Sequence, residues 1–114
     1  MEKKITERTF DFALEIVLLY KFLDGNKEFI FSKQIVRSGT SIGANVEEAQ
    51  VAQSKADFIS KMSIASKEAR ETNYWLRLIR DSGITESSRL SGLIDESNEI
   101  VRILTSIVKT TQSK

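Results

Sequence analysis

The sequence predicts an all-α fold, an antiparallel up-down left-handed four-helix bundle, and three observations support this prediction. None of the 114 residues is proline, which breaks helix interiors and makes up about 5% of average sequences. Apolar residues recur at the alternating spacing of four and three that is typical of packed helices. Turn signals separate these periodic stretches, so we expect one domain over residues 1–114.

The first two helices are expected at residues 6–23 and 31–52, with the turn signal Asp24-Gly25-Asn26-Lys27 between them. Each helix carries apolar or small residues on one face at the four-and-three spacing, which we call its seam. The first seam is Phe12, Ile16, Leu19 and Leu23, and the second is Phe31, Ile35, Ser38, Ile42, Asn45, Ala49 and Ala52.

The last two helices are expected at residues 55–82 and 87–111. Ser54, three residues before Asp57, begins the third as in a capping box, and Gly83 lies where a left-handed residue commonly ends a helix. The third seam runs through three heptads. It is Phe58, Met62, Ala65, Ala69, Thr72, Leu76 and Ile79, and the fourth is Leu90, Ile94, Ser97, Val101, Leu104 and Val108. Four such helices with short connections make an up-down bundle.

A second set of apolar residues lies beside the seams and has two open interpretations. The set comprises Phe10, Val17 and Tyr20 in the first helix, Ile64, Trp75 and Leu78 in the third, and Leu93, Ile100 and Ile107 in the fourth. A helix with two neighbours buries a broad stripe, so the set can belong to the intramolecular core. Otherwise it forms a face for self-association, in which Ile64, Trp75 and Leu78 are the candidate oligomer interface and Trp75 its anchor.

The composition excludes most kinds of site chemistry. Without histidine or cysteine, there is no Ser-His or Cys-His nucleophile and no usual zinc or cluster ligand set. We therefore expect no enzyme, no cofactor, no metal and no small-molecule substrate. No stretch is apolar enough to span a membrane, and a cytoplasmic location is expected. The net charge of +1 gives no general attraction for polyanions.

Small and polar residues concentrate between residues 37 and 49. Gly39 and Gly43 each cost a helix about 1 kcal/mol in propensity, which a closely approaching neighbour helix can offset. Beside them runs a polar stripe, and its spacing places Arg37 opposite Glu68 or Glu71 of the third helix. We expect an ion pair there that fixes the register of the helices. The structural polar motif is thus Arg37, Asn45, Glu48, Glu68 and Glu71. A di-iron carboxylate site is excluded because it requires histidine.

These residues also carry a family resemblance. Phe31-Ser-Lys-Gln-Ile-Val-Arg37-Ser38, with Ser41-Ile-Gly-Ala-Asn-Val-Glu-Glu48, resembles the second helix of the bacterial four-helix bundle family. That family is also called the S23 ribosomal-protein or 23S rRNA intervening-sequence protein family. Residues 56–59 and 64–72 resemble its third helix. The resemblance implies a homopentameric ring, a relation to the accessory variability protein of diversity-generating retroelements, and no established enzymatic activity.

Two functions follow as expectations. The first is a non-enzymatic homo-oligomeric scaffold whose partner cannot be read from the sequence. The alternative is an accessory protein that binds RNA or a ribonucleoprotein, with Lys67, Arg70, Arg77 and Arg80 as candidate nucleic-acid contacts. The simpler interpretation of these four residues is a solvated basic face. The near-neutral net charge favours the scaffold.

Overall fold

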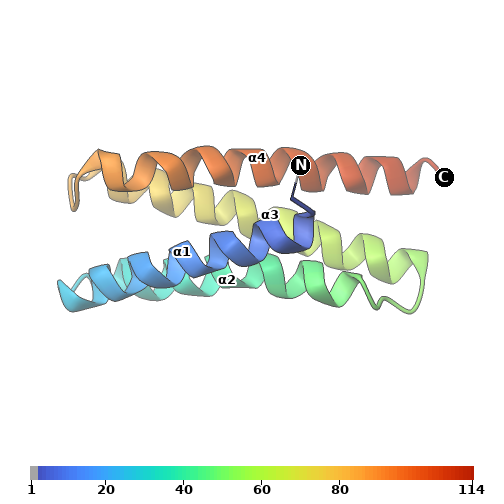
Figure 1. Cartoon of the computed structure of the whole chain (residues 1–114), viewed down its shortest axis with the longest axis horizontal. Helices are drawn as coiled ribbons and strands as arrows, with labels where there is room; N and C mark the ends of the chain where they lie inside the picture. The colour runs from blue at the N-terminus through green and yellow to red at the C-terminus, as the bar shows by residue number, and fades with distance from the viewer. Residues whose placement is uncertain (1–2) are drawn as a thin grey trace.

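The computed structural model describes residues 3–114 as four antiparallel helices in up-down order (Figure 1). They are α1 (Ile5–Gly25), α2 (Phe29–Ala49), α3 (Lys55–Asp81) and α4 (Ser87–Gln112). Each helix packs against the next, and α4 returns beside α1, so α1 and α3 occupy opposite corners. The bundle measures 46 × 24 × 23 Å. The predicted all-α four-helix bundle is confirmed.

The predicted signals that begin and end α3 are present. The Ser54 hydroxyl accepts a hydrogen bond from the Asp57 backbone N–H at 3.0 Å, which caps the first turn. The Asp57 carboxylate in turn accepts from the Gln53 N–H at 3.2 Å. At the other end Gly83 has φ +72°, a conformation that glycine adopts without steric cost, and Ile84 packs back against the core.

The second helix ends earlier than predicted, at Ala49 instead of residue 52. Beyond Ala49 the N–H groups of residues 50–52 bond to carbonyls three residues back, not four, so the chain tightens into a turn. Val51 is exposed in this turn and therefore gives no packing energy that would hold a longer helix. The starts of α3 and α4 fall at the predicted residues, and the other boundaries differ by one or two residues.

The seam positions form the core of the bundle. In α3 all of them except the half-buried Phe58 are buried, from Met62 to Ile79. A buried polar contact crosses this core, because the hydroxyls of Ser38 and Thr72 lie 2.9 Å apart between α2 and α3. The close packing of seam residues from neighbouring helices therefore holds the bundle together.

The second apolar set divides between core and surface. In α4 it joins the core, since Ile100 is fully buried and Leu93 and Ile107 pack against the core, whereas the seam residue Val101 is only half buried. In α3 the outcome is the opposite, because Ile64 and Leu78 remain exposed. The broad-core interpretation therefore holds for α4 and not for the outer face of α3.

The glycines of α2 let α1 approach closely. A Cβ atom on Gly39 would lie 2.6 Å from Cγ2 of Ile16, and one on Gly43 would lie 3.3 Å from the Thr9 carbonyl oxygen. Thr9 and Ile16 both belong to α1 and are fully buried. The predicted role of the small residues, close packing of a neighbouring helix, is therefore confirmed.

Candidate functional site

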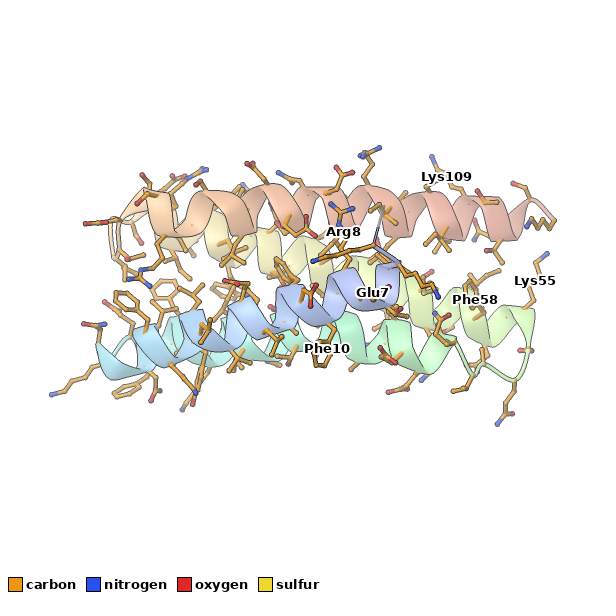
Figure 2. All side chains as sticks on the ribbon, in the orientation of Figure 1. Glu7, Arg8, Phe10, Lys55, Phe58 and Lys109 are labelled. Carbon is orange, nitrogen blue, oxygen red and sulfur yellow. The ribbon has the colours of Figure 1, made fainter. Side chains whose placement is uncertain are left out.

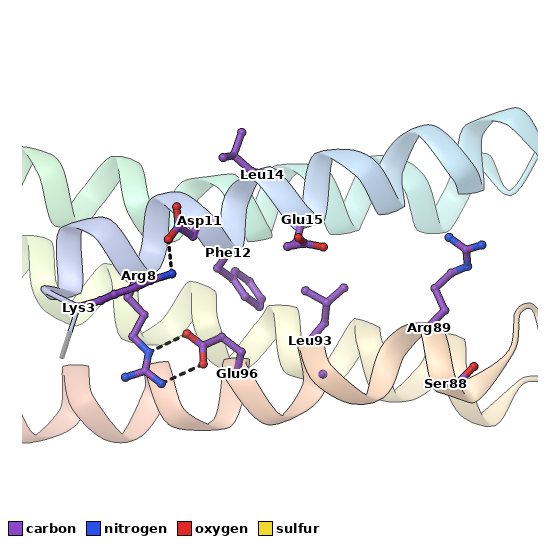
Figure 3. A pocket seen from close by; sticks show the side chains of 11 residues that line it. Lys3, Arg8, Asp11, Phe12, Leu14, Glu15, Ser88, Arg89, Leu93 and Glu96 are labelled. Atoms are coloured by element: carbon purple, nitrogen blue, oxygen red, sulfur yellow. Dashed lines mark hydrogen bonds and ion pairs between the residues drawn. The ribbon is translucent and has the colours of Figure 1, made fainter. Parts of the chain in front are cut away.

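A groove of about 820 Å³ runs between α1 and α4, the neighbouring helices that contact each other least (Figure 3). The other three pairs of neighbouring helices pack closely, but α1 and α4 stand apart. The groove is lined by Lys3, Arg8, Asp11, Phe12, Leu14, Glu15, Ser88, Arg89, Gly92, Leu93 and Glu96. Its volume lies in the range of known ligand pockets.

The floor of the groove is apolar. The Phe12 ring of α1 and the Leu93 side chain of α4 point into the space between the two helices (Figure 3). Gly92 widens the groove, because a Cβ atom at that position would have no atom within 4 Å. This floor can contact an apolar side chain of a partner.

Charged side chains bridge both ends of the groove. At one end the guanidinium of Arg8 binds the Glu96 carboxylate through two hydrogen bonds, at 2.7 and 3.0 Å. Lys3 donates to Asp11 nearby at 2.6 Å, and this hydrogen bond raises the pKa of the Lys3 ammonium. At the other end Arg89 lies over the Phe22 ring, 4.0 Å from its centroid. The Arg8–Glu96 and Arg89–Phe22 contacts tie α4 to α1.

The groove combines an apolar floor with charged side chains that are mostly paired. Its cations and its carboxylates Asp11 and Glu96 already have partners. In residues 3–114 we find no group of three carboxylate, thiol or imidazole side chains placed to hold a metal ion. None of the helices in the same range combines the length and apolar character needed to cross a membrane.

An exposed apolar stripe on α1 adjoins this groove. Phe10, Leu14 and Leu18 are 58%, 53% and 60% exposed, and they follow one another at four-residue spacing along the outer side of the helix. Figure 2 shows Phe10 on the side of α1 away from α4. We call these three residues the α1 patch. Leu14 belongs both to the patch and to the lining of the groove, so the two surfaces are continuous.

A second apolar surface lies on α3, at the opposite corner of the bundle. Ile64 and Leu78 are exposed, as is Tyr74, and Trp75 is half buried between them and the core. The Trp75 ring meets those of Phe31 and Tyr74 edge to face, at centroid distances of 6.3 and 5.3 Å. We call Ile64, Tyr74, Trp75 and Leu78 the α3 patch. It contains all three residues predicted as the candidate interface, with Tyr74 added.

The polar motif forms bridges between α2 and α3. Arg37 contacts both Glu68, at 3.4 Å, and Glu71. The Trp75 indole N–H donates to the same Glu71 oxygen at 2.9 Å. The ion pair expected from the spacing is therefore present, and it also fixes the orientation of Trp75 within the α3 patch.

The remaining members of the motif do not join this network. The Asn45 amide donates to the Ser41 carbonyl at 2.9 Å within its own helix. Glu48 pairs with Lys61 at 2.9 Å, and this hydrogen bond raises the pKa of the Lys61 ammonium. Glu48 thus forms a second α2–α3 bridge near the end of α2.

We expect Arg37→Ala to lower the free energy of unfolding by about 1 kcal/mol, because it leaves the largely buried Glu68 carboxylate without its cation while the pair stays partly open to solvent. Urea unfolding followed by circular dichroism measures this loss. The control Lys3→Ala removes a more exposed pair and should leave stability nearly unchanged. Equal stabilities of the two variants would contradict a role for Arg37 in joining the helices.

The four candidate nucleic-acid contacts lie on α3 and have different surroundings. Arg80 pairs with Asp81 at 2.8 Å, and Arg77 donates to Asn73 at 2.8 Å. Lys67 is exposed. Only Arg70 lines a groove, the one between α3 and α4.

Sequence reasoning missed the α1–α4 groove and two of the three residues of the α1 patch. The signal for Leu14 and Leu18 was present, since both continue the four-residue spacing that starts at Phe10, away from the seam. The groove had no such signal, because the periodicity of apolar residues in one helix does not determine its distance from another helix.

The fold and these surfaces together define the protein as a small up-down helical bundle with exposed apolar patches. Comparison with known proteins makes the class more specific. The model of the family described as 23S rRNA-intervening sequence protein matches residues 1–106, so the chain belongs to the 23S rRNA-intervening sequence protein family. No curated protein matches the chain.

A solved structure from the same family has a closely similar fold. It is a protein of unknown function from the S23 ribosomal protein family of Bacteroides thetaiotaomicron. The two chains are 50% identical and superpose with a TM-score of 0.89, over 93% of this chain and 99% of the other. The resemblance first seen in the helix motifs therefore extends to the whole bundle.

Proposed function

We propose that the protein is a non-enzymatic scaffold that assembles from copies of itself. The observation that carries this proposal is the pair of exposed apolar patches on diagonally opposed helices, α1 and α3. A large apolar surface exposed to water is typical of an interaction site. Two such surfaces on one small chain provide two places at which neighbouring copies can dock.

The positions of the patches favour a head-to-tail assembly. Because the α1 patch and the α3 patch differ in residues and face away from each other, the first can pack against the second on the next copy. Repetition of such a heterologous contact gives a ring when the rotation closes. The family resemblance suggests five copies for this ring. The groove beside the α1 patch, with Leu14 on its rim, enlarges the surface available for the contact.

Light scattering after size-exclusion chromatography tests the assembly. We expect a defined oligomer for the natural sequence and folded monomers for Leu18→Glu and for Leu78→Glu, because each places a charge in one apolar patch. Leu78 is preferable to Trp75 for this purpose because Trp75 also contacts the core. The control Lys33→Glu changes the charge of an exposed position outside both patches and should leave the oligomer intact. A monomeric natural protein would overturn the proposal.

Mixing the two variants tests the head-to-tail arrangement itself. The Leu18→Glu chain keeps its α3 patch, and the Leu78→Glu chain keeps its α1 patch, so one intact contact can form between them. We therefore expect the mixture to form heterodimers that cannot grow further. If Leu18→Glu dissociates the oligomer and Leu78→Glu does not, the contact joins α1 to α1 and the head-to-tail arrangement is wrong.

A further inference from the structure

A second groove, of about 470 Å³, runs between α3 and α4. Three cations line it, Arg70 from α3 and Arg102 and Lys109 from α4. Its other lining residues are polar or apolar, and none is a carboxylate. In a chain whose net charge is only +1, this groove therefore holds a local excess of positive charge.

The register of α3 against α4 brings these cations together. The Asn73 amide donates to the Ser97 hydroxyl at 2.9 Å and to the Asn98 amide oxygen at 3.1 Å. Because the helices are antiparallel, Arg70, three residues before Asn73, is brought opposite Arg102, four residues after Asn98. Lys109 follows two turns further along the same face of α4. Hydrogen bonds between α3 and α4, one of them to the lining residue Asn98, thus set the positions of its charges.

Arg70 differs from the other arginines of residues 3–114. Each of the others has a side-chain partner, a carboxylate for four of them, the Asn73 amide for Arg77 and the Phe22 ring for Arg89. Over the same residues neither Arg70 nor Lys109 has an ion pair or side-chain hydrogen bond. Both can bind an external anion without first breaking an internal contact.

Thr105 supplies a second and independent observation. Thr105 lines the groove, and its Oγ1, buried beneath the surface, is the one buried side-chain polar atom without a hydrogen-bond partner in the part of the chain that the structure describes. By contrast, the hydroxyls of Thr9, Thr40, Thr72 and Thr111 donate to the carbonyl four residues earlier. A buried hydroxyl without a partner is costly, and a ligand oxygen in the groove would provide its acceptor.

We propose that the α3–α4 groove binds a phosphate-bearing ligand through its phosphate oxygens, with Arg70 and Lys109 as the charge partners and the Thr105 hydroxyl as a donor. Arginine and lysine with a hydroxyl are the donors that proteins use for phosphate. Arg102 and Lys109 are seven residues apart, about 10 Å along the helix. The groove therefore suits a chain of phosphates better than a single one. This proposal is independent of the scaffold function.

Two probes distinguish the possible sources of the phosphates, a small polyphosphate and a nucleic-acid backbone. Inorganic tripolyphosphate is titrated by calorimetry, and a fluorescein-labelled single-stranded RNA decamer of mixed sequence is titrated by anisotropy across a salt series. Binding of tripolyphosphate that displaces the RNA supports the proposal with a small ligand as the source. Binding of the RNA alone supports it with a phosphodiester chain as the source.

The variants locate the binding in the groove. Arg70→Gln and Lys109→Gln should each weaken the affinity for whichever probe binds about tenfold. Each should also make the negative slope of log K against log salt shallower by about one. The matched control Lys33→Gln removes an exposed lysine outside the groove and should change neither. Absence of binding of both probes, or equal losses for Lys33→Gln and the groove variants, would overturn the proposal.

Thr105 provides a test that a structural role would not satisfy. Thr105→Val keeps the shape of the side chain and removes the hydroxyl, so we expect weaker binding with unchanged or higher thermal stability. Thr105→Ser keeps the hydroxyl and should restore binding. If Thr105→Val lowers stability and leaves binding unchanged, the hydroxyl serves the fold and takes no part in the site.

Discussion

Replacing Gly39 with alanine is expected to destabilise the bundle by about 1–2 kcal/mol, the net of an overpacking cost of about 1–3 kcal/mol and a smaller gain in helix propensity. The added methyl group would lie 2.6 and 2.8 Å from Cγ2 and Cγ1 of Ile16. Both carbons are attached directly to Cβ of a fully buried side chain, so neither can swing aside. The helices α1 and α2 must then separate to accept the methyl group.

Chemical unfolding of Gly39→Ala and Gly92→Ala measures this effect with a matched control. Gly92 also lies inside a helix, but a Cβ atom there has no neighbour within 4 Å. The same substitution should therefore stabilise the protein by about 0.5–1 kcal/mol. Changes of opposite sign in the free energy of unfolding of the two variants would show that contact with Ile16 causes the loss, and that a general effect of alanine does not. Stabilisation by both variants would contradict close packing at Gly39.

These glycines illustrate how much of the fold could be predicted from the sequence. The periodic seams predicted four helices in order, and Ser54 and Gly83 marked two helix ends correctly, because caps and periodicity depend on neighbouring residues alone. The spacing of Arg37 with Glu68 and Glu71 also predicted a contact between helices. Here the residues lie beside the facing seams of consecutive helices, so a simple antiparallel hairpin was enough to bring them together.

The candidate sites needed the relative placement of helices, which single-helix patterns do not contain. Ile100 is buried and Val101 only half buried, because a small rotation of α4 decides which of two adjacent apolar residues faces inward. Arg70 joins Lys109 in one groove through the register of α3 against α4. The separation of α1 from α4 depends on how the other three pairs of neighbouring helices pack, and therefore on the whole bundle.

The α1 helix provides the sharpest contrast between core and surface, because two phenylalanines two residues apart lie on opposite faces. Phe12 is 2% exposed and covers the core at the floor of the α1–α4 groove, whereas Phe10 belongs to the exposed α1 patch. We expect Phe12→Ala to lower the free energy of unfolding by about 3–5 kcal/mol. This is a large part of the roughly 5–15 kcal/mol of a typical domain.

Phe10→Ala should change the unfolding free energy of the monomer by less than about 0.5 kcal/mol and should reduce the mass of the oligomer. Unfolding is measured at several protein concentrations, because association stabilises the folded chain in a concentration-dependent way. The two variants remove the same side chain from the same helix, so helix propensity cancels and only the direction of the ring differs. A stability loss for Phe10→Ala as large as that for Phe12→Ala, at every concentration, would place Phe10 in the core and would remove the α1 patch from the proposed contact.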